Sequence, residues 1–184
     1  MALTATEILR RLSRDLGGGG AVCLLGIDES ELAAALGERP PWPQWPEPDA
    51  ACPRTAVIAA REVSSTGDIA VTPAAIASAE RLGTTVSAIV QDADRVVALL
   101  AGAPPNAASL VPRCSEADVV EQAAHQVLCP WAALDVTAEG LVIRELAPGL
   151  CARRLQAMVS VPLRISSDVV ELDLEGQQAA SGGD

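Results

Sequence analysis

The chain contains no phenylalanine and no tyrosine, and only three of its 184 residues are tryptophan. Proteins that bind single-stranded nucleic acid stack its bases on aromatic side chains, and phosphate binding in general requires positive charge. The formal net charge of −11, together with the scarcity of aromatic residues, therefore argues against nucleic acid as a partner. The same negative charge disfavours binding to an anionic membrane surface.

Long hydrophobic runs are missing as well. No segment approaches the roughly 20 consecutive apolar residues of a membrane-spanning helix. The N-terminal segment has the pattern of an amphipathic helix and lacks the hydrophobic core of a signal peptide. The cysteines are odd in number and include no C-x-x-C pair, so they predict neither a disulfide framework nor a zinc site. We therefore expect a cytoplasmic protein without a metal. The five cysteines are Cys23, Cys52, Cys114, Cys129 and Cys151.

The sequence does contain enough aliphatic residues for a core. Hydrophobic residues make up 49% of the chain and the mean hydropathy is +0.28, so a folded domain is expected. Residues 38–53 combine six prolines with Trp42 and Trp45, a density that excludes a helix or a central strand. This connector lies either against a partner chain or on the chain's own core. We predict one domain over residues 1–174 and a disordered tail over 175–184.

Apolar periodicity and capping residues predict an alternation of helices and short strands. A capping box at Thr4 and Glu7 begins the first helix. Helices are predicted over residues 5–16, 29–36, 73–82, 115–127 and 151–158, and strands over 21–25, 55–60, 69–71, 95–101, 131–136, 141–146 and 162–165. The apolar face of the helix that begins at Thr72-Pro73 is predicted to consist of Ala75, Ile76, Ala79 and Leu82. Residues 84–90 fit either a strand, by β-branching, or a helix, by spacing.

A hairpin from Arg54 to Val71 is the central feature of the sequence. Its first strand is apolar and ends in Arg61-Glu62-Val63, and the turn residues Ser64 to Asp68 lead into the second strand. A charged pair at the end of a buried strand is where an open α/β sheet places its ligand crevice. Glu62 is therefore a candidate functional residue. The alternative is a solvated strand end with an ordinary turn.

Three other features of the sequence have some of the character of functional sites. The run Gly17 to Gly20 precedes a strand and is not followed by Lys-Ser/Thr, so it is not a phosphate loop. Gly26 follows a strand and precedes a helix N-terminus, whose amides could hold an anionic group. The acidic residues Asp28 and Glu31 oppose this role, and capping explains them. The single histidine, His125, has no nucleophile or paired carboxylate near it in sequence and is predicted to be a surface or packing residue.

The last third of the chain carries a specific hairpin motif. Trp131 to Leu150 reads W-A-A-L-D-V-T-A-E-G-L-V-I-R-E-L-A-P-G-L, and M-V-S-V-P-L-R-I follows from Met158. These segments resemble the C-terminal end of the B (β) subunit of 3-oxoacid CoA-transferases, which has the form F-D-V-x-x-x-G-L-x-L-x-E-x-A-P-G followed by a helix and T-x-A-P-F/L-x-V. The start of the chain and the hairpin from Ala56 to Ala70 are also similar to that subunit. Together the similar segments cover most of the chain in the family's order.

The sequence departs from this family at its nucleophile. The S-E-N-G motif that holds the family's catalytic glutamate is absent, because the interval that contains it is replaced by the proline-rich connector. Without that carboxylate, ping-pong transfer has no covalent carrier of CoA. Most of the family's G-M-G-G loop is also missing, and only Gly83 is in register with it. This register makes Thr84 to Asp92 a helix.

The resemblance implies an α/β fold, namely a shortened CoA-transferase-like open, mostly parallel sheet with helices on both faces. It implies coenzyme A as part of an acyl-CoA substrate, an A-type partner subunit in a heterodimer or heterotetramer, and Gly26 and Gly83 as coenzyme-binding positions. Glu62 replaces the glutamine usual in transferases, and we expect it to act as a general acid or base. The expected activity is that of a divergent decarboxylase, hydrolase or lyase. The alternatives are a non-catalytic structural or regulatory subunit and a true CoA-transferase subunit.

Overall fold

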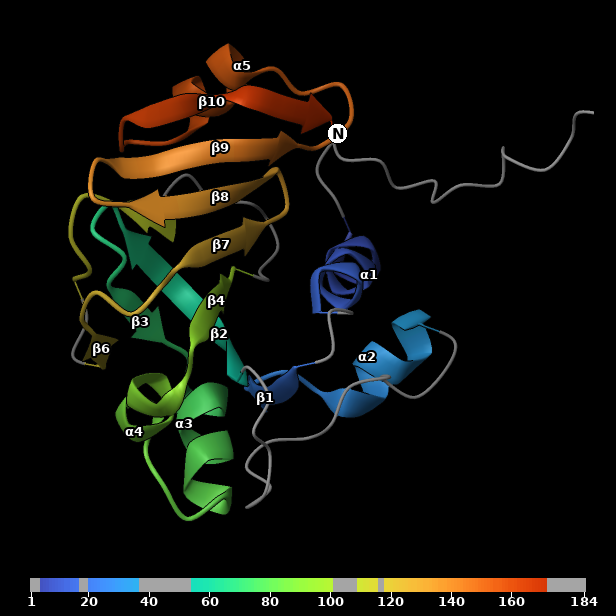
Figure 1. Ribbon diagram of the computed structural model, residues 1–184, viewed down its shortest axis with the longest axis vertical. Helices are drawn as coiled ribbons and strands as arrows, with labels where there is room; N and C mark the ends of the chain where they lie inside the picture. The colour runs from blue at the N-terminus through green and yellow to red at the C-terminus, as the bar shows by residue number, and fades with distance from the viewer. Residues whose placement is uncertain (1–3, 17–19, 37–53, 101–108, 116–117, 172–184) are drawn as a thin grey trace, which may run out of the picture.

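The computed structural model describes residues 4–16, 20–36, 54–100, 109–115 and 118–171 (Figure 1). The predicted connector at 38–53 and tail at 175–184 lie outside these residues. The helices are α1 (Ala5–Leu16), α2 (Glu29–Leu36), α3 (Pro73–Arg81), α4 (Val86–Asp92) and α5 (Ala152–Met158). The strands are β1 (Ala21–Leu25), β2 (Arg54–Ser64), β3 (Ile69–Val71), β4 (Arg95–Leu99), β5 (Leu110–Val111), β6 (Val119–Val120), β7 (Gln126–Cys129), β8 (Ala132–Thr137), β9 (Gly140–Leu146) and β10 (Leu163–Glu171). No described helix is both long and apolar enough to span a membrane.

The described strands form one mixed, mostly parallel sheet. Its parallel half has the order β1-β2-β4-β7. Strands β8 and β9 continue it as an antiparallel meander, and β10 joins β9 in parallel at the edge. These features, with helices on both faces of the sheet, confirm the predicted α/β fold class.

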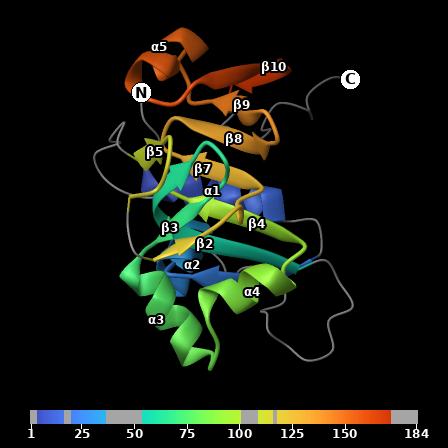
Figure 2. The same ribbon diagram turned by 90° about the vertical axis from the view of Figure 1, so that its left-hand side faces the viewer.

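Strand β2 belongs to two parts of the sheet. Its first half lies between β1 and β4, and its second half pairs with β3 and β5. Between these halves the pairing with β3 skips Arg61, since Ala60 faces Val71 and Glu62 faces Ala70. This β-bulge bends the strand. In Figure 2 the hairpin β2–β3 consequently lies in front of the sheet, with α1 behind it.

Side chains that alternate along the strands fill two separate cores. Val57 and Val97 point to one face, where they pack against Ile8 and Leu12 of α1 and Leu32 of α2. On the other face, neighbouring residues of the same strands pack against α3, α4, α5 and the hairpin. Members of this second cluster include Ala56, Ile58, Val96, Ala98, Ile69, Ala75, Val86, Leu110 and Leu155.

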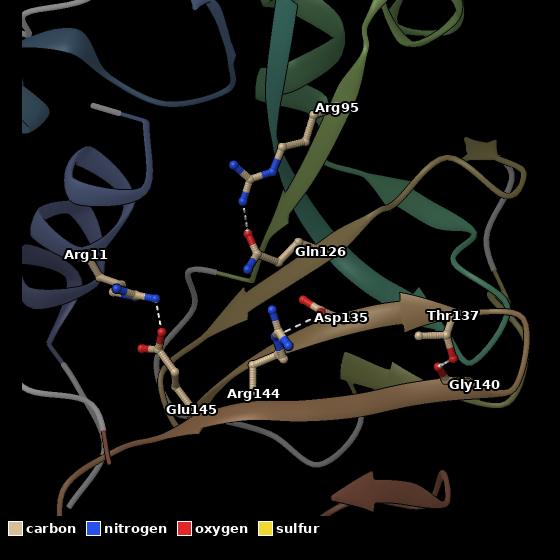
Figure 3. Close-up of polar contacts among 8 residues, drawn as sticks. All are labelled: Arg11, Arg95, Gln126, Asp135, Thr137, Gly140, Arg144 and Glu145. Carbon is tan, nitrogen blue, oxygen red and sulfur yellow. Dashed lines mark hydrogen bonds and ion pairs between the residues drawn. The ribbon is translucent and has the colours of Figure 1, made fainter. Parts of the chain in front are cut away.

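Polar contacts fix the helix ends and tie α1 to the sheet. The predicted capping box is present, because Thr4 donates its amide and hydroxyl hydrogens to Glu7 while the Glu7 amide donates to the Thr4 hydroxyl. The Thr72 hydroxyl accepts from the Ala75 amide at 3.2 Å and caps α3 as predicted. Figure 3 shows the ion pair of Arg11 on α1 with Glu145 on β9.

The structure corrects three expectations. The predicted helix over 115–127 is wrong, because Val119–Val120 form β6 beside β3, and Gln126–Cys129 form β7 between β4 and β8. Pairing with distant strands has overridden the local helical spacing. Leu82, predicted on the buried face of α3, is 45% exposed. The first hairpin strand, predicted to end at Arg61-Glu62-Val63, continues to Ser64. Residues 86–92 are helical, which confirms the interpretation taken from the family register.

Candidate functional site

Glu62 lies on β2 directly after the bulge, where it is partly buried. The bulged residue Arg61 is held from the side, since its Nε donates to the carbonyl of Val71 on β3 at 3.1 Å. Bulges redirect the side chains that follow them and are frequent beside active sites. The bulge therefore gives Glu62 a defined direction on the hairpin.

Among the residues that the structure describes, Ser115 is the one that donates hydrogen bonds to the Glu62 carboxylate. The Ser115 amide donates to Oε2 at 3.0 Å, and the Ser115 hydroxyl lies 3.1 Å from Oε1 and 3.2 Å from Oε2. All of these donors are neutral. Glu62 is therefore a hydrogen-bonded carboxylate that forms no ion pair within the described part of the chain.

The segment that carries Ser115 wraps around the end of the hairpin. Before Ser115, β5 pairs in parallel with Val63 and Ser64 of β2. After it, the Asp118 carbonyl accepts from the Val71 amide at 3.0 Å, and β6 pairs with β3. Ser115 is thus fixed from both sides, which holds it against Glu62.

A second polar cluster forms the turn of the hairpin. The fully buried Ser64 hydroxyl accepts from the amides of Thr66 and Asp68 at 3.2 and 3.0 Å, and it lies 2.8 Å from the Asp68 carboxylate. Burial alone would raise the pKa of Asp68. Hydrogen bonds from the Gln122 amide and the hydroxyls of Ser64 and Thr66, with the charge of Arg113, outweigh burial and lower that pKa. Asp68 is therefore an anion that organises the turn.

The turn also clamps the chain that leads into β7. Gln122 has a left-handed backbone with φ of 46°, uncommon outside glycine, and its amide donates to Asp68 Oδ1 at 2.9 Å. The Gly67 carbonyl accepts from the amides of Ala123 and Ala124. A Cβ on Gly67 would lie 2.9 Å from Val136, so only glycine fits this contact. The strained conformation is therefore maintained by hairpin contacts.

Two hollows flank the turn, and Thr66 and Gln122 line both of them. One, of about 640 Å³, extends past His125 to the β8–β9 turn. The other, of about 520 Å³, extends past Cys114 and Arg113. Glu62 lines neither of these hollows. The second hollow adjoins the segment that holds the Glu62 carboxylate.

Three cysteines of the described segments have thiols with a raised pKa. Burial raises the pKa of the Cys114 thiol, and the nearby carboxylates of Glu62 and Asp68 raise it further. Burial also raises the pKa values of Cys23 and Cys129 to about 11. A thiol with a raised pKa holds little thiolate at neutral pH. Cys52 lies outside the described residues, as do Trp42 and Trp45.

The two glycines predicted to contact a coenzyme have different surroundings. The Gly26 amide donates to the Ser78 hydroxyl at 3.1 Å, and a Cβ on Gly26 would lie 2.7 Å from the Ala75 amide nitrogen. Gly83 follows α3 and has open space where a Cβ would stand. Both have φ of +73°. Glu62, Gly26 and Gly83 do not share either hollow of the hairpin.

His125 has a structural contact. Its Nδ1 accepts from the Val96 amide at 3.1 Å, so the proton of the neutral ring is on Nε2. The residue is exposed and lines the larger hollow. Within the described residues, no three His, Cys, Asp or Glu side chains gather in a group that could hold a metal ion.

Sequence reasoning selected Glu62 but missed Ser115, which it treated as a helix cap. The turn residues Ser64 to Asp68 were recognised as a turn, without the carboxylate network of Asp68. A signal existed in the two β-branched residues Val119-Val120, which favour a strand over a helix. A strand there would have placed Ser115 in the loop beside the hairpin.

The fold of the chain is similar to folds seen in solved structures. No family model matches the chain, and no curated protein sequence matches it. A variant of the decarboxylase AibA/AibB matches in structure with a TM-score of 0.64 and 14% identity, over 92% of this chain and 88% of that chain. The acyl-CoA transferase YdiF from E. coli O157:H7, as a thioester complex with CoA, matches with a TM-score of 0.62 and 11% identity, over 95% of this chain and 44% of that chain. The chain therefore has the CoA-transferase-like fold.

Proposed function

We propose that this chain is the B-type subunit of a heteromeric CoA-transferase-family complex that acts on an acyl-CoA thioester by divergent chemistry. Decarboxylation, hydrolysis and carbon–carbon cleavage are the candidate reactions. One observation carries the proposal: the fold matches a decarboxylase over most of both chains, while the sequence lacks the S-E-N-G glutamate of the transferases. The same absence argues against a true CoA-transferase, which needs that carboxylate as the carrier of CoA.

Glu62 is the residue proposed to carry the chemistry. It is a partly buried carboxylate, directed by a β-bulge and held by neutral donors. A carboxylate of this kind can accept a proton from the substrate or return one to it. In this role Glu62 replaces covalent catalysis with acid–base catalysis.

The proposal includes an A-type partner, in a heterodimer or heterotetramer. This chain spans 44% of the acyl-CoA transferase chain that it matches, which leaves more than half of that chain without an equivalent here. The name AibA/AibB of the decarboxylase also denotes two components. We propose that the partner supplies the missing half and binds most of the coenzyme, while Gly26 and Gly83 contribute from this chain.

A second candidate function is a non-catalytic subunit that stabilises or regulates an active partner. The contact of Glu62 with Ser115 favours this alternative, because the carboxylate is already hydrogen-bonded within its own chain. Such a carboxylate could serve only to join the hairpin to the 110–120 segment.

Turnover in the assembled complex distinguishes the two functions. The chain is co-expressed with a candidate A-type CoA-transferase subunit, and a panel of acyl-CoA thioesters is followed by mass spectrometry. Glu62→Gln is expected to lower the rate at least about a hundredfold, since acid–base catalysis contributes 10²–10⁴. Glu80→Gln on the exposed side of α3 is the matched control and should keep the wild-type rate. An unchanged rate in Glu62→Gln would leave the non-catalytic function as the better account.

A further inference from the structure

Ser115 provides both a backbone and a side-chain donor to the same carboxylate. Its amide binds Oε2 of Glu62 at 3.0 Å, and its hydroxyl lies within 3.2 Å of both oxygens. A carboxylate that rotates about its last bond would break at least one of these contacts. Two donors from one residue therefore fix both the position and the rotation of the carboxylate plane.

The segment that leads to Ser115 is hydrogen-bonded to the hairpin turn. The Ser65 amide donates to the Val111 carbonyl at 3.1 Å, and the Cys114 thiol donates to the Asp68 carbonyl at 3.4 Å. The first contact lies on β5 and the second on the residue before Ser115, and both attach the segment to the hairpin turn. The direction of Glu62 is therefore set by a segment distant in sequence, not by the strand alone.

The contact leaves the carboxylate able to react. Neutral donors do not neutralise its charge as an arginine would. An ionised carboxylate has about four lone-pair positions, and Ser115 has only two hydrogens to donate. Counting the described donors alone, about two lone-pair positions of Glu62 are left for a proton from another molecule.

We infer that Ser115 is the positioning residue for Glu62 in the reaction. It holds the carboxylate in the orientation needed for proton transfer and does not itself react with the substrate. This inference rests on the proposed function, because it assigns a role within the same site. It predicts that removing the hydroxyl lowers the rate of the chemical step more than it weakens substrate binding.

The test compares serine variants in the complex with the A-type subunit, with the best acyl-CoA of the panel as substrate. Ser115→Ala keeps the amide donor and loses the hydroxyl, and kcat should fall about tenfold to a hundredfold with KM within about twofold. Ser115→Thr keeps a hydroxyl and should restore most of kcat. Ser87→Ala, at an exposed position on α4, is the control and should match the wild type. The melting temperatures of all variants should agree within about 2 °C.

The possible results separate this inference from the proposed function. If Glu62→Gln abolishes turnover while Ser115→Ala leaves kcat unchanged, the function stands and the positioning role is wrong. If Glu62→Gln leaves turnover unchanged, the proposed catalytic function is wrong and the positioning role falls with it. An acyl group found on Ser115 by mass spectrometry of the trapped enzyme would make that residue a nucleophile and overturn the inference. Failure of Ser115→Thr to restore kcat would also overturn it.

Discussion

The two faces of the sheet are built differently. The face covered by α1 and α2 is an aliphatic cluster formed by residues such as Leu12, Leu32 and Val57. The hairpin face also has an apolar core, but it adds the buried hydroxyl of Ser64, the carboxylates of Glu62 and Asp68, a β-bulge and a left-handed residue. Buried polar groups cost stability unless they are hydrogen-bonded, and strained backbone is retained where surrounding contacts enforce it. The first face therefore serves stability, and the second is where function is expected.

The largest expected effect comes from removing a buried side chain on the face that α1 and α2 cover. Leu12 is fully buried between α1 and the sheet, so Leu12→Ala should lower the free energy of unfolding by about 4 kcal/mol. Urea unfolding measures the loss. Leu82→Ala, at a position 45% exposed, should change it by less than about 0.5 kcal/mol. Turnover per folded complex should equal that of the wild type in both variants. A lower turnover in Leu12→Ala alone would contradict the assignment of this face to stability.

Two glycines at the edge of the hairpin face allow a crowded position to be compared with an open one. The quantity compared is the stability lost when each glycine is replaced by alanine. Gly26→Ala should cost about 3 kcal/mol, because it combines a left-handed backbone with a Cβ placed 2.7 Å from the Ala75 nitrogen. Gly83→Ala has the same φ and no close neighbour, so about 1 kcal/mol is expected. Thermal unfolding compares the two variants. Equal costs would mean that the close approach to α3 is relaxed in solution.

The ion pair that joins α1 to β9 is expected to make an intermediate contribution to the free energy of unfolding. The Arg11 and Glu145 side chains are 13% and 18% exposed, so Glu145→Ala should cost about 2 kcal/mol, less than a fully buried pair. Glu139→Ala breaks the exposed pair with Arg164, whose side chains are 58% and 66% exposed, and should cost at most about 0.5 kcal/mol. Chemical denaturation at low and high salt measures both. A similar loss in the two variants would show that burial does not strengthen the α1 contact.

The smallest expected effect is a pH dependence of the hairpin face. The pKa of Asp68 is lowered in the folded chain, so its contribution to stability is present above its unfolded pKa of about 4 and is lost as pH falls through the lower folded value. Asp68→Asn should flatten the acid side of the stability–pH curve, followed by urea midpoints between about pH 2 and pH 7. Glu7→Gln is the matching variant on the opposite face, in α1. Hydrogen bonds from the Thr4 amide and hydroxyl lower the pKa of Glu7 in the same direction. An unchanged acid slope in Asp68→Asn would contradict the proposed role of the turn network.

The sequence predicted most where local chemistry decides structure. The hairpin turn at Ser64 to Asp68 and the caps at Thr4 and Thr72 were placed correctly, because these side chains bond to backbone groups a few residues away. The 115–127 segment failed because its conformation depends on strands β3, β4 and β8, which lie elsewhere in the sequence. The same contrast between local and distant contacts applies to the candidate site. Glu62 was found from its place beside the turn, and Ser115 was missed because 53 residues separate the two.

The central proposal is that the Glu62 carboxylate performs acid–base chemistry on an acyl-CoA bound in a complex of this chain with an A-type subunit. Single-turnover rates of the wild-type and Glu62→Gln complexes, each normalised to the folded fraction, test it most directly. The account predicts that the variant binds the thioester but converts it at least about a hundredfold more slowly. Equal rates in the two complexes would contradict it.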